Sequence, residues 1–178
     1  MIRFFAIVLL CIGAACVYGV LQNQITARVC VEYFTIGHEP VFDTDDPTLL
    51  GLGWGVLATW WVGLIMGLVL AAAARLGRRP QRSPGSLIRP IVVLLVIMAM
   101  CATAAGVAGY FLGKSKSVTL APHLAERVPV EKHPRYMACF FAHTASYWVG
   151  FVGGGLNVAV VWASRKRIRS RPSLPSKP

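Results

Sequence analysis

An uncharged apolar run from Leu49 to Ala74 constrains this chain more than any other feature of the sequence. The run is longer than the roughly 20 apolar residues that a helix needs to cross a bilayer. It ends abruptly in a basic cluster made of Arg75, Arg78, Arg79 and Arg82. Because Lys and Arg are concentrated in cytoplasmic loops, this pattern predicts both a transmembrane helix and the end that stays in the cytoplasm.

Small residues recur every four positions inside this run, at Gly51, Gly55, Thr59, Gly63, Gly67 and Ala71. Such spacing places them on one face of a helix. In lipid, a face of small residues lets two helix backbones approach closely. We therefore expect this face to pack against another helix, and we expect the same of the glycines in the later apolar runs, Gly106, Gly150, Gly153 and Gly154.

The composition points to a membrane protein throughout its length. Hydrophobic residues make up 56% of the chain and charged residues only 14%, whereas soluble domains carry about 25% charged residues. Four apolar runs cover residues 4–21, 49–74, 91–112 and 136–163, which predicts an all-α bundle of four transmembrane helices in a single domain. The connecting segments are then outer loops at 22–48 and 113–135, an inner loop at 75–90 and a basic tail at 164–178, with both termini in the cytoplasm.

Three local features refine this prediction. The first run could be a cleaved signal peptide, since Arg3 precedes it, but it continues through Leu21 and so favours a retained helix. The piece 25–34 is rich in β-branched and aromatic residues and predicts a short strand or an extended segment. Asp46 or Thr48 is expected to cap the second transmembrane helix, and Pro90 to open the third.

The net charge of +11 reflects sorting along the chain rather than a surface for nucleic acid. All acidic residues lie in two segments, 28–46 and 126–131, and no basic–aromatic motif for nucleic acid accompanies the bases. The expected partners are the lipid bilayer and anionic lipid headgroups. The residues expected to contact headgroups are Arg75, Arg78, Arg79, Arg82, Arg165, Lys166, Arg167 and Arg169.

The four runs contain no Asp, Glu, Lys or Arg, which argues against ion-coupled transport. The ionisable His143 belongs to a seam of polar and small residues in the fourth run, Cys139, His143, Ser146, Gly150, Gly153 and Asn157. Two interpretations stay open for this seam: helix packing through hydrogen bonds, or a site that opens at the outer surface.

A metal or small-ligand site is the more specific hypothesis. Glu32 and His38 lie in the first outer loop, on the same predicted side as His143. A zinc or similar metal site built from these three residues, with or without His133, is sterically conceivable, although the separation of Glu32 and His38 matches no standard metal spacing. No cofactor is otherwise predicted. A disulfide between Cys30 and Cys139 is also left open, because no C-x-x-C pair is present among the five cysteines.

Two segments carry a resemblance to known proteins. The heptapeptide EYFTIGH at 32–38 and the run WGVLATWWVGLIMGLVLAAAARLG at 54–77 resemble a group of uncharacterised bacterial integral membrane proteins. The resemblance covers about Val29 to Gly77. It implies a four-helix protein in a bacterial membrane, most simply the cytoplasmic membrane, and it implies no activity.

Abundant packing residues and the lack of a catalytic constellation favour a non-enzymatic role. We expect a structural or accessory membrane protein that acts as a homo-oligomer or with other membrane proteins. The alternative is a membrane enzyme or sensor with an extracytoplasmic site around Glu32, His38 and His143.

Overall fold

The computed structural model describes the backbone of residues 1–169 and the side chains of residues 1–165. Its long helices are α1 (Ile2–Val29), α3 (Pro47–Leu57), α4 (Trp60–Arg75), α5 (Gly85–Lys114) and α7 (His133–Arg169). Short helical turns, α2 (Glu32–Thr35), α6 (Pro122–Ala125) and η1 (Val130–Lys132), lie in the connections. The described part of the chain contains no strand, so the all-α prediction is confirmed.

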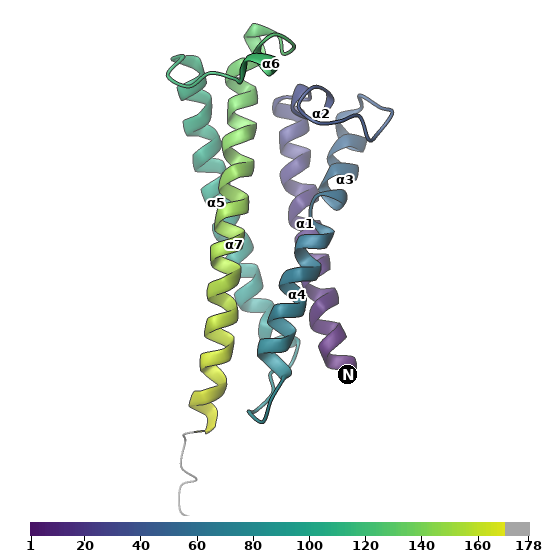
Figure 1. Cartoon of the computed structure of the whole chain (residues 1–178), viewed down its shortest axis with the longest axis vertical. Helices are drawn as coiled ribbons and strands as arrows, with labels where there is room; N and C mark the ends of the chain where they lie inside the picture. The colour runs from purple at the N-terminus through teal and green to yellow at the C-terminus, as the bar shows by residue number, and fades with distance from the viewer. Residues whose placement is uncertain (170–178) are drawn as a thin grey trace, which may run out of the picture.

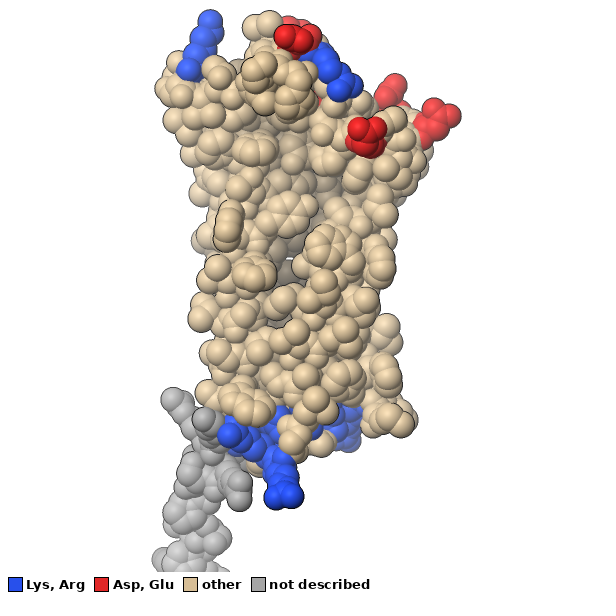
Figure 2. Space-filling model, viewed as in Figure 1, with Lys and Arg blue, Asp and Glu red and all other residues tan. Residues whose placement is uncertain are grey.

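Within the described residues, four helical segments are long and apolar enough to cross a membrane: Ile2–Val29, Pro47–Arg75, Gly85–Lys114 and Val130–Arg165. The N-terminus and the last described turn of α7 lie at the same end of the bundle (Figure 1). Figure 2 shows acidic side chains only at the opposite end, and an uncharged belt between the two ends. We call the end that holds α2 and α6 the outer end and the opposite one the inner end, after the predicted topology.

The helices form two pairs. In the first helix pair, α1 packs along both α3 and α4; in the second helix pair, α5 packs along α7 (Figure 1). The two pairs touch each other much less than the helices within each pair do. The fold is therefore two tightly packed hairpins laid side by side.

Glycines bring α1 close to α3 and α4. A Cβ added to Gly55 would lie 2.5 Å from the Cα of Val20, and one added to Gly63 would lie 2.7 Å from the Cα of Ile12. Only a residue without a side chain permits such an approach of two backbones, as is common between helices in lipid.

Two buried cores join the pairs at the two ends of the bundle. The outer core gathers residues of both outer loops and of α1, α3 and α7: Ala27, Cys30, Tyr33, Phe34, Leu50, Leu120, Val128, Tyr136, Met137 and Cys139. The inner core draws on α1, α4, α5 and α7: Ile7, Val8, Cys11, Leu70, Ala71, Ala74, Leu87, Ile91 and Val161. Helix pairs that meet at both ends and little between them leave room at mid-height.

Several predicted boundaries differ from the structure. Segment 25–34 forms the last turns of α1 and the turn α2 rather than a strand. The Thr26 hydroxyl donates to the Gln22 carbonyl within α1, and Ala27 is buried in the outer core, so tertiary packing outweighs the β propensity of this piece. The first loop is correspondingly shorter than predicted.

The predicted second span, 49–74, is divided by a break at Ala58–Thr59. The Thr59 hydroxyl donates to the Gly55 carbonyl at 2.6 Å, a back-bond that bends helices. The helix start was predicted correctly: the Asp46 carboxylate accepts hydrogen bonds from the backbone N–H groups of Thr48 and Leu49.

The third and fourth helices extend beyond their predicted limits. Pro90 lies inside α5 because a turn over Ser83–Leu87 starts the helix earlier, with backbone hydrogen bonds to the carbonyls of Ser83 and Pro84. Helix α7 continues to Arg169, into the predicted tail. The rest of that tail, residues 170–178, lies outside the described residues.

Candidate functional site

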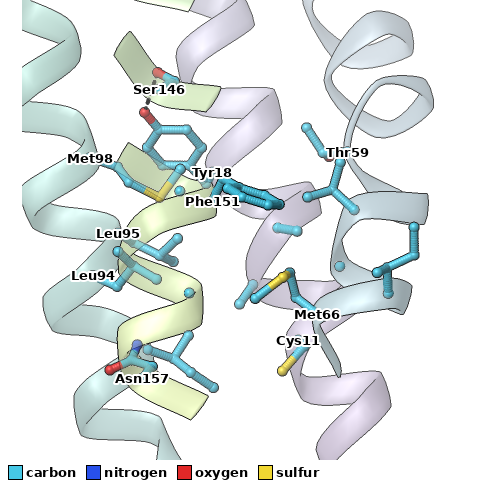
Figure 3. A pocket seen from close by; sticks show the side chains of 18 of the residues that line it. Cys11, Tyr18, Thr59, Met66, Leu94, Leu95, Met98, Ser146, Phe151 and Asn157 are labelled. Carbon is cyan, nitrogen blue, oxygen red and sulfur yellow. Dashed lines mark hydrogen bonds between the residues drawn. The ribbon is translucent and has the colours of Figure 1, made fainter. Parts of the chain in front are cut away.

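A cavity of about 600 Å³ lies between the two helix pairs at mid-height. Side chains from α1, α4, α5 and α7 line it (Figure 3). Met66 and Phe151 are among the residues that line it, and its lining surface is almost entirely apolar. The cavity exists because the helix pairs are joined mainly by the outer and inner cores and make few contacts between them, such as that of Met66 with Gly154.

Few polar groups reach the cavity. At one end, the Tyr18 hydroxyl and Ser146 Oγ are 2.7 Å apart (Figure 3). Ser146 already donates to the Ala142 carbonyl, so its single proton is used and Tyr18 is the donor of the pair. At the other end, the Asn157 amide donates to the Pro90 carbonyl at 3.2 Å.

The cavity opens sideways, toward the region that lipid fills. Phe151 and Trp148 line it and yet are 74% and 67% exposed. Figure 2 shows the surface hollowed at mid-height in the uncharged belt. No Asp, Glu, Lys or Arg is among its lining residues, so the geometry suits the binding of an apolar group rather than acid–base chemistry.

The predicted site residue His143 lies above this cavity, in the outer half of α7. Its Nε2 is 2.9 Å from Thr26 Oγ1. Since the Thr26 hydroxyl donates to the Gln22 carbonyl, the His143 Nε2–H is the donor of this bond. The His143 ring also stacks on Tyr33 with a centroid distance of 4.8 Å. Both contacts tie α7 to the first helix pair.

His38 has partners of its own. Its Nδ1–H donates to the Tyr33 carbonyl at 2.8 Å, and its ring lies 4.8 Å from the Trp54 ring. Glu32 is paired elsewhere: its carboxylate lies 3.3 Å from Lys132 Nζ and accepts a hydrogen bond from the Cys30 thiol. Among the described residues, no three His, Cys, Asp or Glu side chains gather as a metal site. The zinc hypothesis remains a prediction for metal analysis to test.

The ion pair of Glu32 and Lys132 joins the first outer loop to η1, the short turn that directly precedes α7. Burial alone would raise the pKa of the Glu32 carboxyl, but hydrogen bonds from its own backbone N–H, Cys30 and Lys132, together with the charge of Lys132, hold that pKa below its usual value. Burial and the neighbouring Glu32 carboxylate raise the pKa of the Cys30 thiol to about 12, so it remains a hydrogen-bond donor at neutral pH.

This ion pair should make stability pH-dependent. A carboxyl whose pKa is lower in the folded state stabilises the fold above its unfolded pKa of about 4.3, and the contribution is lost as pH falls through the folded pKa. We expect Glu32→Gln to lower the melting temperature at pH 7 by roughly 2–4 °C, for about 1 kcal/mol, and to lower it less at pH 3. Thermal unfolding in detergent at both pH values measures this. Equal differences at both pH values would contradict a role for the charge.

The basic residues that were predicted to contact lipid headgroups lie in different surroundings. Arg165 has a different role: its side chain is fully buried and donates to the backbone carbonyls of Ala73, Leu76, Arg79 and Pro80. Arg79 lies over the Trp162 ring, 4.3 Å from its centroid. Arg78 is exposed. The side chains of the remaining predicted contacts in the tail, Lys166, Arg167 and Arg169, lie outside the described ones.

The predicted packing glycines lie at helix contacts. Gly51 and Gly67 face α1, through Gln24 and Val8. Gly106 faces Ala138 and Ala142 of α7. In α7, the flexible side chains Met98, Leu94 and Met66 lie over its small residues Gly150, Gly153 and Gly154 respectively.

Neither the cavity nor two further close contacts between helices were predicted from the sequence. Gly19 of α1 faces Gly55 and Thr59, and Gly109 of α5 lies against Met137 and Phe141. Their positions in apolar runs are the signal that could have revealed them. Cys30 and Cys139 are both buried free cysteines, so the structure contains no disulfide between them.

Helices of this length and composition make the chain an integral membrane protein. Comparisons with protein family models, with curated proteins and with solved structures found no match.

Proposed function

We propose that this protein is a non-enzymatic accessory component of a bacterial cytoplasmic membrane that holds an apolar chain of a membrane molecule in its central cavity. The cavity between the helix pairs carries this proposal. Its volume of about 600 Å³ falls within the range of roughly 300–1,000 Å³ that is usual for small-molecule sites. Its sideways opening gives access from the bilayer rather than from water.

The lining favours an acyl or similar hydrocarbon chain over water. A buried water needs two to four polar partners, and polar side chains in the cavity lining such as Tyr18, Asn157 and Thr59 already hydrogen-bond to protein groups. An apolar chain needs none. It also gains dispersion contacts with the lining side chains, which an empty space would forfeit.

Further features support the location and the accessory role. The inner loop has five arginines and no acid, and the positive-inside rule makes this the basis for our proposal that this end and both termini face the cytoplasm. Large apolar side chains such as Phe151 remain exposed on the belt and offer contact area to lipid, to a second copy or to another membrane protein.

The experiment fills the cavity with a side chain. Val62 of α4 lines the cavity, whereas Val69 of the same helix is exposed and does not. Each is replaced by tryptophan, and apolar molecules that copurify with the protein in mild detergent are extracted and quantified by mass spectrometry. We expect about one tightly held molecule per chain in the wild type and in Val69→Trp, and a loss of most of it in Val62→Trp.

Equal retention in both tryptophan variants, at equal melting temperatures, would contradict the proposal. Thermal unfolding of each variant separates loss of the ligand from loss of the fold.

A further inference from the structure

A second hollow lies at the inner half of the second helix pair. This groove, of about 360 Å³, runs between α5 and α7 and is lined by Arg89, Pro90, Val93, Ile97, Gly153 and Leu156. At the wall of the groove, the Leu94 side chain packs over Gly153, which has no Cβ to displace it. Leu94 and Asn157 line both the groove and the central cavity, but the remaining lining residues differ.

The groove is charged at one end and apolar along the rest. Arg89 is the charged residue among those that line it, and its side chain is exposed in the second turn of α5, close to the inner loop. Val93 and Ile97 follow it at intervals of four residues, on the same face of the helix. At 1.5 Å per residue, this face runs about 12 Å from the loop toward mid-membrane.

No acidic side chain neutralises this end. The inner loop and the start of α5, residues 75–90, contain five arginines and no Asp or Glu. A guanidinium offers a planar fork of donors that matches a phosphate, and near an interface it seeks an anion. The apolar part of the groove meanwhile faces outward, with Val93, Ile97 and Leu156 each about half exposed to the space that lipid occupies.

We propose that this groove is a binding site for one anionic phospholipid. Its phosphate pairs with the Arg89 guanidinium, and one acyl chain lies along Val93, Ile97 and Leu156. A soluble phosphate fits only the charged end, whereas a phospholipid matches both the charge and the apolar length of the groove. The site does not depend on the central cavity and would stand if that cavity bound nothing.

The test uses matched pairs of variants. Arg89→Gln removes the charge of the groove. Arg78→Gln removes an exposed inner-loop charge that was predicted to contact headgroups but does not line the groove, so it is the control for diffuse attraction of anionic lipid. Val93→Trp fills the groove, and Val92→Trp adds the same bulk to a neighbouring residue that is likewise 50% exposed and does not line it.

Each protein is reconstituted into vesicles of equal parts phosphatidylglycerol and phosphatidylcholine, and the lipids that stay bound are identified by native mass spectrometry. We expect the wild type to retain about fivefold more phosphatidylglycerol than phosphatidylcholine, which is the effect expected of one basic side chain close to an anionic lipid. Arg89→Gln should remove this preference and Val93→Trp should remove the bound lipid, while Arg78→Gln and Val92→Trp keep both.

Three results would overturn the proposal. Equal losses in Arg89→Gln and Arg78→Gln would mean that charge acts diffusely. Equal binding by Val93→Trp and Val92→Trp would mean that the groove holds no chain. Complete displacement of the lipid by excess glycerol phosphate would mean that the apolar part contributes nothing. The melting temperatures of all four variants identify any that fail to fold. If Val93→Trp fails to fold, the smaller change Val93→Ile replaces it. We expect Val93→Ile to reduce lipid binding, and unchanged binding would count against the site.

Discussion

Replacing Gly63 by leucine is expected to prevent the first helix pair from assembling. A Cβ at this position would lie 2.7 Å from the Cα of Ile12 and 2.8 Å from the carbonyl oxygen of Cys11. Both atoms belong to the backbone of α1, which cannot turn aside as the end of a flexible side chain can. Overpacking of a close-packed site usually costs about 1–3 kcal/mol, and here we expect at least about 3 kcal/mol because two helices must separate.

Thermal unfolding and gel filtration of the purified protein measure this effect. Gly13→Leu in α1 is the control, because no atom lies within 4 Å of a Cβ added there. Gly63→Leu should yield little folded monodisperse protein, and Gly13→Leu should behave as the wild type. Two variants of equal stability would show that the close approach of α1 and α4 is not needed.

Replacing Arg165 by glutamine should have the second largest effect. The fully buried guanidinium connects α7 to the end of α4 and to the inner loop by hydrogen bonds to Ala73, Leu76, Arg79 and Pro80. Carbonyls at the end of a helix have no partner inside it, so a fork of donors from a neighbouring helix satisfies them. Loss of the donor for one buried carbonyl, that of Ala73, and for three partly buried ones should together cost about 3 kcal/mol.

Three variants separate this role from simple charge. Arg165→Gln should lower the melting temperature most, and Arg165→Lys should be intermediate because an ammonium cannot reproduce the planar fork. Arg78→Gln removes an exposed charge and should change the melting temperature little. If Arg165→Lys proved as stable as the wild type, a point charge near the inner loop would be sufficient and the hydrogen-bond fork would not matter.

The four spans could be predicted because each is a long uncharged run, and the bilayer sets the length that such a run must have. The helix ends that lie outside the apolar runs could not be predicted in this way. The last turns of α1 continue past Gln22 through polar residues, where Asn23 and Thr26 are buried by packing against other segments. Local composition around Ile25 and Val29 indicated a strand, and tertiary contacts of the outer core overrode it.

The candidate sites show the same limit. Sequence position placed His38 and His143 on one side of the membrane, and both do contact the Tyr33 ring. Their polar atoms, however, bond to separate groups, which no spacing rule reveals. The cavity was also hidden, because its walls come from α1, α4, α5 and α7 and its size depends on how far apart the pairs lie.

The two ends of the bundle explain why a cavity can persist between the pairs. At the outer end, the aromatic contacts of Tyr33 and the ion pair of Glu32 with Lys132 connect the pairs. At the inner end, the Arg165 fork and the inner core do so. With both ends fixed, the pairs cannot close onto each other at mid-height without breaking these contacts.

Photolabelling can show whether membrane lipid enters the cavity. The protein is reconstituted with a phosphatidylcholine that carries a diazirine midway along one acyl chain, irradiated, and mapped by peptide mass spectrometry. We predict labels on cavity-lining residues such as Cys11, Met66 and Met98, in addition to the outward-facing belt, and their loss in Val62→Trp. Labels confined to outward-facing residues such as Leu9 and Val107, with none in the cavity, would contradict the account.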